Sequence, residues 1–460
     1  MTRTTFTSPR VQSIPLVLTL FLLSIFPHTT LSQPATEDRI FPFPYEVRHL
    51  PNGLTVILCR YDSPGIVSCF TAVRAGSRDE IEAGHTGFAH LFEHMMFRGT
   101  QLYPAERYNE ILMELGVDNN AFTSEDWTCY TNTLSADNLE KIIRIEADRF
   151  INLSYTEEKF RKESGAVLGE YNKDASNPDQ ILYETLMKEA FAAHTYRHTV
   201  IGFLEDIEAM PGYYDYSLEF YKRHYRPENT AVIAVGDLDI ERTYEWIARD
   251  YADWKPGHDE TPTPPEPPQT EGKEARIPWE SPTLPYLQIG WHSPAFSTAD
   301  PAGPALEVLG QLLFSTTAPL YQKLVLDEQR VETIYASADP HRDPYLFVVQ
   351  ARVKREEDLA PVQEEIEKAL DEIGRQPVSA QRLDDARSHL RNRFLMGLET
   401  PGMIAYTLGY FYILSGDPTD LDRYYRLFEG LTPEKISEVV QKYLKDKNRT
   451  VVTLVQQGEL

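Results

Sequence analysis

The stretch HLFEH, residues 90–94, combines two histidines and a glutamate at spacings that suit metal chemistry. On an α-helix each residue advances about 100°, so His94 lies about 40° from His90, and Glu93 lies about 60° from it on the other side. All three side chains therefore share one face. Two such imidazoles can bind one Zn²⁺, and the glutamate can take a proton from a metal-activated water. The alternative is an amphipathic helix that carries these polar residues by chance.

The residues around this motif predict how its helix is held. His85 would lie about 140° from His90, so it is not predicted as a ligand, and we expect it at the helix start, where Thr86 could be the cap. His194 and His198 have the same spacing as the motif histidines, but neighbouring Thr and Gly residues favour a loop and we place no metal there. A catalytic zinc needs three protein ligands, so one must come from elsewhere in the chain. The apolar residues that would bury the helix are Leu91, Phe92, Met95, Met96 and Phe97.

Strand-like and helical patterns alternate along two long segments of the chain. Residues 40–254 and the segment after residue 276 each mix period-two apolar runs with helical periodicity. Between them, residues 256–272 are rich in proline, which prevents regular hydrogen-bonded structure. The strand-like stretches NTAVIAVGDLD and NRTVVTLVQQGE end the two halves in a similar way. We therefore predict an N-terminal domain over 33–255, a linker over 256–275 and a homologous C-terminal domain over 276–460.

The N-terminal residues predict export. Arg3 and Arg10 precede an apolar stretch at 14–26, and small residues follow it, which is the pattern of a secretory signal peptide cleaved after Ser32. No later segment reaches the roughly 20 apolar residues that a membrane helix needs. We predict an exported protein without a membrane span, in the periplasm in preference to full secretion.

The net charge limits the classes of binding partner, and the cysteine count predicts the state of the thiols. The formal net charge is −25 at pH 7, which argues against nucleic acid and anionic membranes. It favours cationic peptides if the acids line a cavity, although a solvated acidic surface is the simpler explanation. The three cysteines, Cys59, Cys69 and Cys129, are an odd number and predict unpaired thiols.

Three segments, HLFEHMMFRGT, NNAFTSEDWTCY and KESGAVLGEYN, follow one another in the chain. In this order they resemble the inverted-motif zinc peptidases, the family of pitrilysin, insulin-degrading enzyme and mitochondrial processing peptidase, and in length its short two-domain bacterial members. The resemblance implies that His90, His94 and Glu170 bind one Zn²⁺ per chain and that Glu93 is the general base. It also implies that Glu163, two helical turns before Glu170, supports the zinc site by contacting a ligand rather than the metal. A solvated helix acid is the alternative for Glu163.

The second of these segments resembles the family's edge strand beside the zinc. Asn120, Ala121 and Phe122 are then candidates for binding an extended peptide by strand addition. Without the resemblance, this segment is a polar hairpin, and Phe122 and Trp127 are more typical of a core or sheet face than of a specificity pocket.

The resemblance also implies the fold class. We expect an α+β protein with two similar domains, each a mainly antiparallel sheet with helices packed on one face, facing each other around a cavity. One departure from the family concerns the second domain, which in many relatives contributes an arginine and a tyrosine that bind the substrate backbone. Here Pro319 stands at the arginine position and Tyr335 does not fall cleanly at the tyrosine position. We therefore predict that a metal-free homologous partner subunit, or a homodimer, completes the site.

The function predicted is a zinc-dependent endopeptidase of short or unfolded peptides. The alternative is an inert scaffold or binding subunit of a heteromeric complex, because fold alone does not prove activity. The complete metal set favours the enzyme. A zinc hydrolase of non-peptide substrates explains neither the strand-like NAFTS segment nor the two-domain plan.

Overall fold

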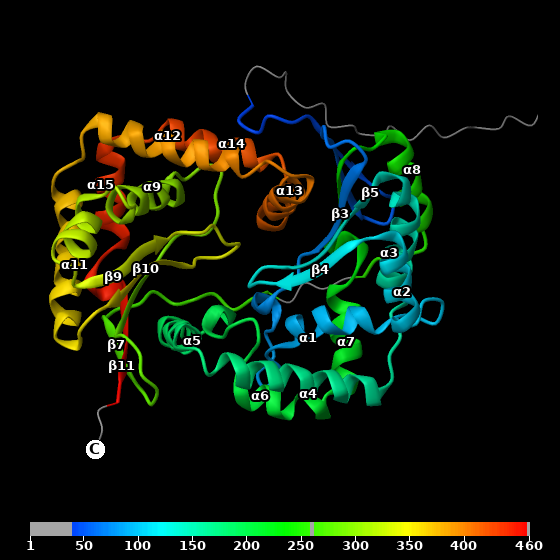
Figure 1. Ribbon diagram of the computed structural model, residues 1–460, viewed down its shortest axis with the longest axis horizontal. Coiled ribbons are helices and arrows are strands. Elements are labelled where there is room, and N and C mark those ends of the chain that lie inside the picture. Colours follow the sequence, from blue (N-terminus) through cyan, green and yellow to red (C-terminus); the bar gives the residue numbers. More distant parts are fainter. Residues whose placement is uncertain (1–38, 258–261, 458–460) are drawn as a thin grey trace, which may run out of the picture. The chain divides into compact units, whose positions relative to one another are not determined.

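The computed structural model describes residues 39–257 and 262–457 (Figure 1). The predicted signal peptide, residues 1–32, lies outside the described residues and stays a prediction. None of the described helices is both long enough and apolar enough to cross a membrane.

The first half of the chain forms a six-stranded sheet. Its strand order is β1-β2-β6-β3-β5-β4, and all neighbours are antiparallel except β2 and β6. The strand β4 therefore lies at an edge of the sheet. The strands are β1 (Tyr45–His49), β2 (Thr55–Arg60), β3 (Ile66–Val73), β4 (Asp118–Thr123), β5 (Thr128–Ser135) and β6 (Thr230–Gly236).

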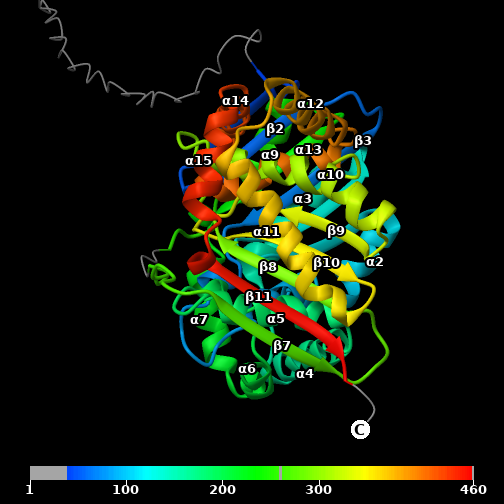
Figure 2. The same ribbon diagram turned by 90° about the vertical axis from the view of Figure 1, so that its left-hand side faces the viewer.

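The second half forms a five-stranded sheet with the same pattern of pairing. Its order is β7-β11-β8-β10-β9, with one parallel pair, β7 and β11, in the place that β2 and β6 hold in the first sheet. The two strands whose similarity the sequence showed, β6 and β11, are thus equivalent, and the prediction of two similarly built α+β halves is confirmed. Figure 2 shows this second sheet. Its strands are β7 (Lys273–Trp279), β8 (Tyr286–His292), β9 (Val331–Ser337), β10 (Leu346–Val353) and β11 (Arg449–Gln456).

Helices connect the strands of both halves. In the first half they are α1 (Phe88–Met95), α2 (Ala105–Leu115), α3 (Leu139–Asn152), α4 (Glu157–Asp174), α5 (Pro178–Ala190), α6 (Leu204–Ala209), α7 (Tyr214–His224) and α8 (Ile240–Asp250). In the second half they are α9 (Ala302–Phe314), α10 (Pro319–Tyr321), α11 (Leu359–Arg375), α12 (Ala380–Met396), α13 (Pro401–Ser415), α14 (Asp420–Glu429) and α15 (Pro433–Tyr443).

Each sheet also packs against one helix from the other half. Helix α5 contacts β7, β8 and β11 of the second sheet, and α13 contacts β3 and β6 of the first sheet. Alternate residues of β2 belong to different cores: Val56 belongs to the cluster that includes the apolar residues of α1, and Ile57 to the cluster that includes those of α13. The first sheet is therefore buried on both faces, which explains why β2 and β6 are almost continuously apolar.

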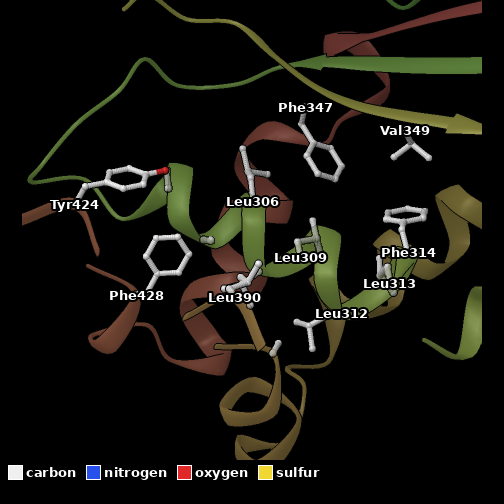
Figure 3. Close-up of a cluster of buried hydrophobic side chains, with 14 of the residues drawn as sticks. Leu306, Leu309, Leu312, Leu313, Phe314, Phe347, Val349, Leu390, Tyr424 and Phe428 are labelled. Carbon is white, nitrogen blue, oxygen red and sulfur yellow. The ribbon is translucent and has the colours of Figure 1, made fainter. Parts of the chain in front are cut away.

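The core of the second half is built from leucines of α9. Leu306, Leu309 and Leu313 belong to one buried cluster with Phe347 on β10 and Phe428 on α14 (Figure 3). An apolar stripe on α9 thus attaches this helix layer to the second sheet.

The proline-rich segment is tied to the first half by one carboxylate. Glu266 accepts hydrogen bonds from the backbone N–H groups of Ala192, Ala193 and His194, at 2.8, 2.9 and 2.9 Å. The described chain from residue 39 onward falls in one compact unit, and β7 begins at Lys273, so the predicted division into domains at 256–275 stays a prediction. The three cysteines are buried and unpaired.

Candidate metal site

The helix α1 carries the HLFEH motif, and its start is held by a buried carboxylate. The oxygens of Glu80 accept hydrogen bonds from Gly87 N at 2.7 Å and Ala89 N at 2.6 Å, two of the N–H groups that a helix start leaves unpaired. Gly87 has a positive φ of 88°, and a Cβ there would lie 2.4 Å from Ile201 O, so only glycine fits. The buried apolar residues of this helix are Phe88, Ala89, Leu91, Phe92 and Met95. The helix is therefore fixed on both its apolar face and its first turn.

The structure brings the three predicted metal ligands together. Glu170 Oε2 on α4 lies 3.7 Å from His90 Nε2 and 3.5 Å from His94 Nε2. One ligand atom from each residue lies within 4.8 Å of the others, and this is the one such group among the described residues. The exposed fraction of the side chain is 12% for His90 but 41% for Glu170, so the group opens on one side.

These side chains fit a zinc ion. Zinc bonds of about 2.0 to 2.2 Å in a tetrahedron place neighbouring ligand atoms about 3.3 to 3.6 Å apart, close to the two separations to Glu170. Burial and the nearby positive charge of His94 lower the pKa of His90 to about 4, so that its imidazole is neutral at pH 7 and its nitrogen lone pair is available. Two imidazoles and one carboxylate are an established donor set for catalytic zinc.

Glu163, on the same face of α4 as Glu170, lies close to His94. The Glu163 residue is 5% exposed, which excludes the solvated alternative. Its Oε2 lies 3.9 Å from His94 Nδ1, and its Oε1 lies 3.2 Å from Arg98 Nε. A carboxylate near the far nitrogen of a ligating histidine can orient its ring, and the support of the zinc site by Glu163 stays a prediction.

Glu93 faces the same opening as the metal group and has a fixed orientation. Thr123 Oγ1, in β4, donates a hydrogen bond of 2.7 Å to Glu93 Oε2. Burial raises the pKa of Glu93, and the hydrogen bond from Thr123 opposes that rise. A carboxylate with a raised pKa beside a metal group suits proton transfer.

The predicted peptide-binding residues lie on the edge strand β4. Asn120, Ala121 and Phe122 pair with β5 on one side, opposite Thr131, Tyr130 and Cys129. The other side of β4 has no strand neighbour in the sheet. An edge strand of this kind can pair with an extended peptide.

Phe122 also lines a cavity of about 1070 Å³ whose walls come from both halves of the chain. Its ring packs at 5.0 Å from Trp127 and at 5.7 Å from Tyr406 of α13. Tyr335, on β9, lines the same cavity and is 50% exposed. Pro319 lies elsewhere, at the first position of α10, and lines a different, smaller cavity.

Two expectations about the neighbouring residues were wrong or incomplete. Thr86 does not cap α1, because its hydroxyl donates to Asp206 Oδ2 at 2.7 Å, and Glu80 fills the capping role instead. The sequence analysis also missed Thr123, although it lies inside the NNAFTSEDWTCY segment. His85 is not part of the metal group, since it packs against Tyr213 and Tyr216.

Two family profiles match this chain. The family described as "Insulinase (Peptidase family M16)" matches residues 56–202, and "Peptidase M16 inactive domain" matches residues 214–390. The chain belongs to the M16 peptidase family. All three residues of the metal group lie within the first of the matched M16 ranges.

Named relatives include a zinc protease and a processing peptidase subunit. The zinc protease PqqE of Helicobacter pylori is 27% identical over 88% of this chain and 91% of its own length. A probable mitochondrial-processing peptidase subunit beta of Arabidopsis thaliana is 24% identical over 93% of this chain and 81% of its own length.

Solved structures of the M16 family share the fold. A protease from Helicobacter pylori has a TM-score of 0.83 at 25% identity and covers 90% of this chain and 100% of its own. A protein from Pseudomonas fluorescens described as a peptidase M16 inactive domain has a TM-score of 0.78 at 17% identity, with 90% and 100% covered. Since the same fold occurs in a neighbour described as inactive, activity has to be argued from the site.

Proposed function

We propose that this chain is a zinc-dependent endopeptidase that hydrolyses short or unfolded peptides. The observation that carries the proposal is the meeting of His90, His94 and Glu170 within the reach of one ion, with Glu93 on the same helix face. The zinc proteases among the relatives support it.

His90, His94 and Glu170 would hold the metal. A zinc ion bound there supplies Lewis-acid chemistry, which makes a water molecule more acidic and polarises a peptide carbonyl. Glu93 accepts the proton of the attacking water and then donates it to the leaving amine. Thr123 holds Oε2 of Glu93, which leaves Oε1 for proton transfer. Glu163 keeps the ring of His94 in place.

The peptide is held as an additional strand on β4. Main-chain pairing at this edge gives affinity with little demand on the peptide sequence, which suits unfolded substrates. The cavity beside Phe122 takes substrate side chains, and Tyr335 from the second half contacts them. A folded protein offers no free extended segment that could reach this edge.

The absence of an arginine at Pro319 favours a second subunit. In this proposal a metal-free homologous chain, or a second copy, contributes the missing cationic contact to the substrate. The protein acts after export, in the periplasm. The scaffold reading stays as the second candidate, because Pro319 departs from the pattern of catalytically complete relatives.

Cleavage of a mixed pool of unfolded peptides by the purified, zinc-loaded mature chain tests the proposal, with Glu93→Gln as the control. Hydrolysis by the wild type that is lost in the variant supports a self-sufficient peptidase and removes the need for a partner. One bound zinc per chain without hydrolysis supports the two-subunit form. In that case, adding the partner subunit should restore hydrolysis. Absence of bound zinc contradicts the proposal and favours the scaffold.

A further inference from the structure

A second cluster of charged side chains surrounds a cavity of about 250 Å³, which we call the arginine cavity. It shares no lining residue with the metal group. Its described lining contains four guanidinium groups, Arg74, Arg78, Arg226 and Arg342, and one carboxylate, Asp79. The remaining described lining residues are Ile81, His224, Asn229, Pro262 and Thr263. The balance of charge in this lining is therefore strongly positive.

Two described carboxylates near the arginine cavity, Asp79 and Asp343, are paired with Arg78. Asp79 Oδ1 lies 3.0 Å from Arg78 Nη1, and its Oδ2 accepts from Gly76 N at 3.1 Å. Asp343 Oδ2 lies 2.6 Å from Arg78 Nε and 3.0 Å from His194 Nε2. Arg78 therefore has two counter-charges, and the one described carboxylate that also approaches Arg342 is Asp79, at 3.6 Å.

Arg342 is incompletely paired. Its Nη1 is buried and lies 3.6 Å from Asp79 Oδ2, too far for a hydrogen bond, and it makes none with the described residues. The exposed fraction of the Arg342 side chain is 17%, so water can satisfy its unpaired donors only in part. An under-paired buried donor of this kind is costly unless something else accepts from it.

Arg74 has a hydrogen bond but no carboxylate partner within the described chain. Its Nε donates to Ile413 O at 3.1 Å. Arg74 and Arg342 line the same cavity, and burial together with the positive charge of Arg342 lowers the pKa of Arg74 to about 10. A negative charge between them would reverse this unfavourable interaction.

We propose that the arginine cavity binds a small oxyanion of the phosphate or carboxylate type, held between Arg74 and Arg342. The planar, multiply donating guanidinium group matches both kinds of oxyanion. The volume is below the roughly 300 to 1,000 Å³ of sites for drug-sized ligands, so the ligand is a free anion of few atoms. Arg226, whose Nη1 is paired with Glu228 at 2.8 Å, contributes its field rather than a free donor.

The bound anion would join the two halves of the chain. Arg74 follows β3 of the first sheet, and Arg342 lies in the segment between β9 and β10 of the second. A ligand that binds only the folded chain stabilises it by mass action. The anion therefore raises the stability of the junction between the two halves.

Calorimetric titration of the purified mature protein with inorganic phosphate, and separately with succinate, tests this site. Sodium chloride keeps the ionic strength constant, and thermal unfolding is followed at each anion concentration. We expect one anion per chain and an unfolding temperature that rises with its concentration. Arg342→Gln should weaken binding at least tenfold. Arg74→Lys keeps the positive charge but loses the planar pair of N–H donors, and it should weaken binding less. Arg355→Gln, at an arginine whose side chain is 61% exposed, is the matched control and should change nothing.

Binding of phosphate alone, of succinate alone or of both identifies the type of oxyanion. Stabilisation equal to that by chloride, or binding that Arg342→Gln leaves unchanged, overturns the proposal. Circular dichroism of each variant without anion distinguishes loss of the site from loss of the fold. If Arg74→Lys does not fold, the result for Arg342→Gln alone tests the proposal. No readout requires peptide hydrolysis, so the result is independent of the proposed peptidase activity.

Discussion

Thr123 Oγ1 on the edge strand β4 lies 2.7 Å from Glu93 Oε2 on the helix α1 and donates a hydrogen bond to it. This bond joins the strand proposed to bind the peptide to the carboxylate proposed to move the proton. In the proposed mechanism, Thr123 therefore helps to set the distance between the bound peptide and the general base. A displacement of the base of about 1 Å is enough to cost on the order of 100-fold in rate.

Thr123→Val removes this donor while it keeps the shape of the side chain. We expect kcat to fall about tenfold or more with little change in KM, because the base is misplaced while the edge strand still pairs with the peptide. Steady-state kinetics on one peptide substrate measure both constants. Thr123→Ser keeps the hydroxyl and should retain most of the activity. A rise in KM at unchanged kcat would instead assign Thr123 to peptide binding.

Glu170→Gln and Glu93→Gln form a matched pair for the metal site. Each removes one carboxylate from the same region, but only Glu170 is proposed as a ligand, since its Oε2 lies within 3.7 Å of both histidines. Metal analysis after dialysis should find one zinc per chain in Glu93→Gln and far less in Glu170→Gln. The reverse result would exchange the roles of the two glutamates.

Gly409 permits the close approach of α13 to the first sheet. A Cβ at this position would lie 2.9 Å from Ile233 Cδ1 and 3.3 Å from Trp127 Cζ3. Gly409→Val should lower the free energy of unfolding by about 1 to 3 kcal/mol, because both neighbours are in a packed core. Gly165→Val on α4, where nothing lies within 4 Å, should be close to neutral. Equal effects in urea unfolding would show that α13 shifts freely on the sheet.

Glu307 should make stability depend on pH. Burial raises its pKa to about 7, and the hydrogen bond from Tyr424 only partly offsets this. The folded chain therefore binds a proton that the unfolded chain, with a pKa near 4.5, releases earlier. The stabilisation is complete below about pH 4.5 and is lost as the pH rises through 7.

Glu307→Gln should remove this dependence, because an amide cannot ionise. Between pH 4.5 and 8 the stability of the variant should improve relative to the wild type by about 1 to 3 kcal/mol. Urea unfolding at several pH values measures the difference. Parallel pH curves for the two proteins would mean that Glu307 titrates normally in the fold.

Much of the fold could be read from local patterns. The runs of β-branched residues at β6 and β11 predicted strands at both chain positions, and helical geometry predicted the shared face of the motif residues. Local patterns did not predict that each sheet is also packed against a helix from the other half. The apolar face of α13 shows that it is buried, but its pattern does not say that it packs against β3 and β6 of the other half.

The sequence by itself determined which side chains could form the candidate site. Spacing within one helix fixes the relative direction of His90, Glu93 and His94, because helical geometry is local. The tertiary structure decided three relationships between distant parts of the chain. Glu80 lies at the start of α1, Thr123 donates to Glu93, and Arg342 and Arg74 line one cavity. Apolar burial drives these segments together but is non-directional, so the identity of each polar partner emerges only when the whole chain is packed.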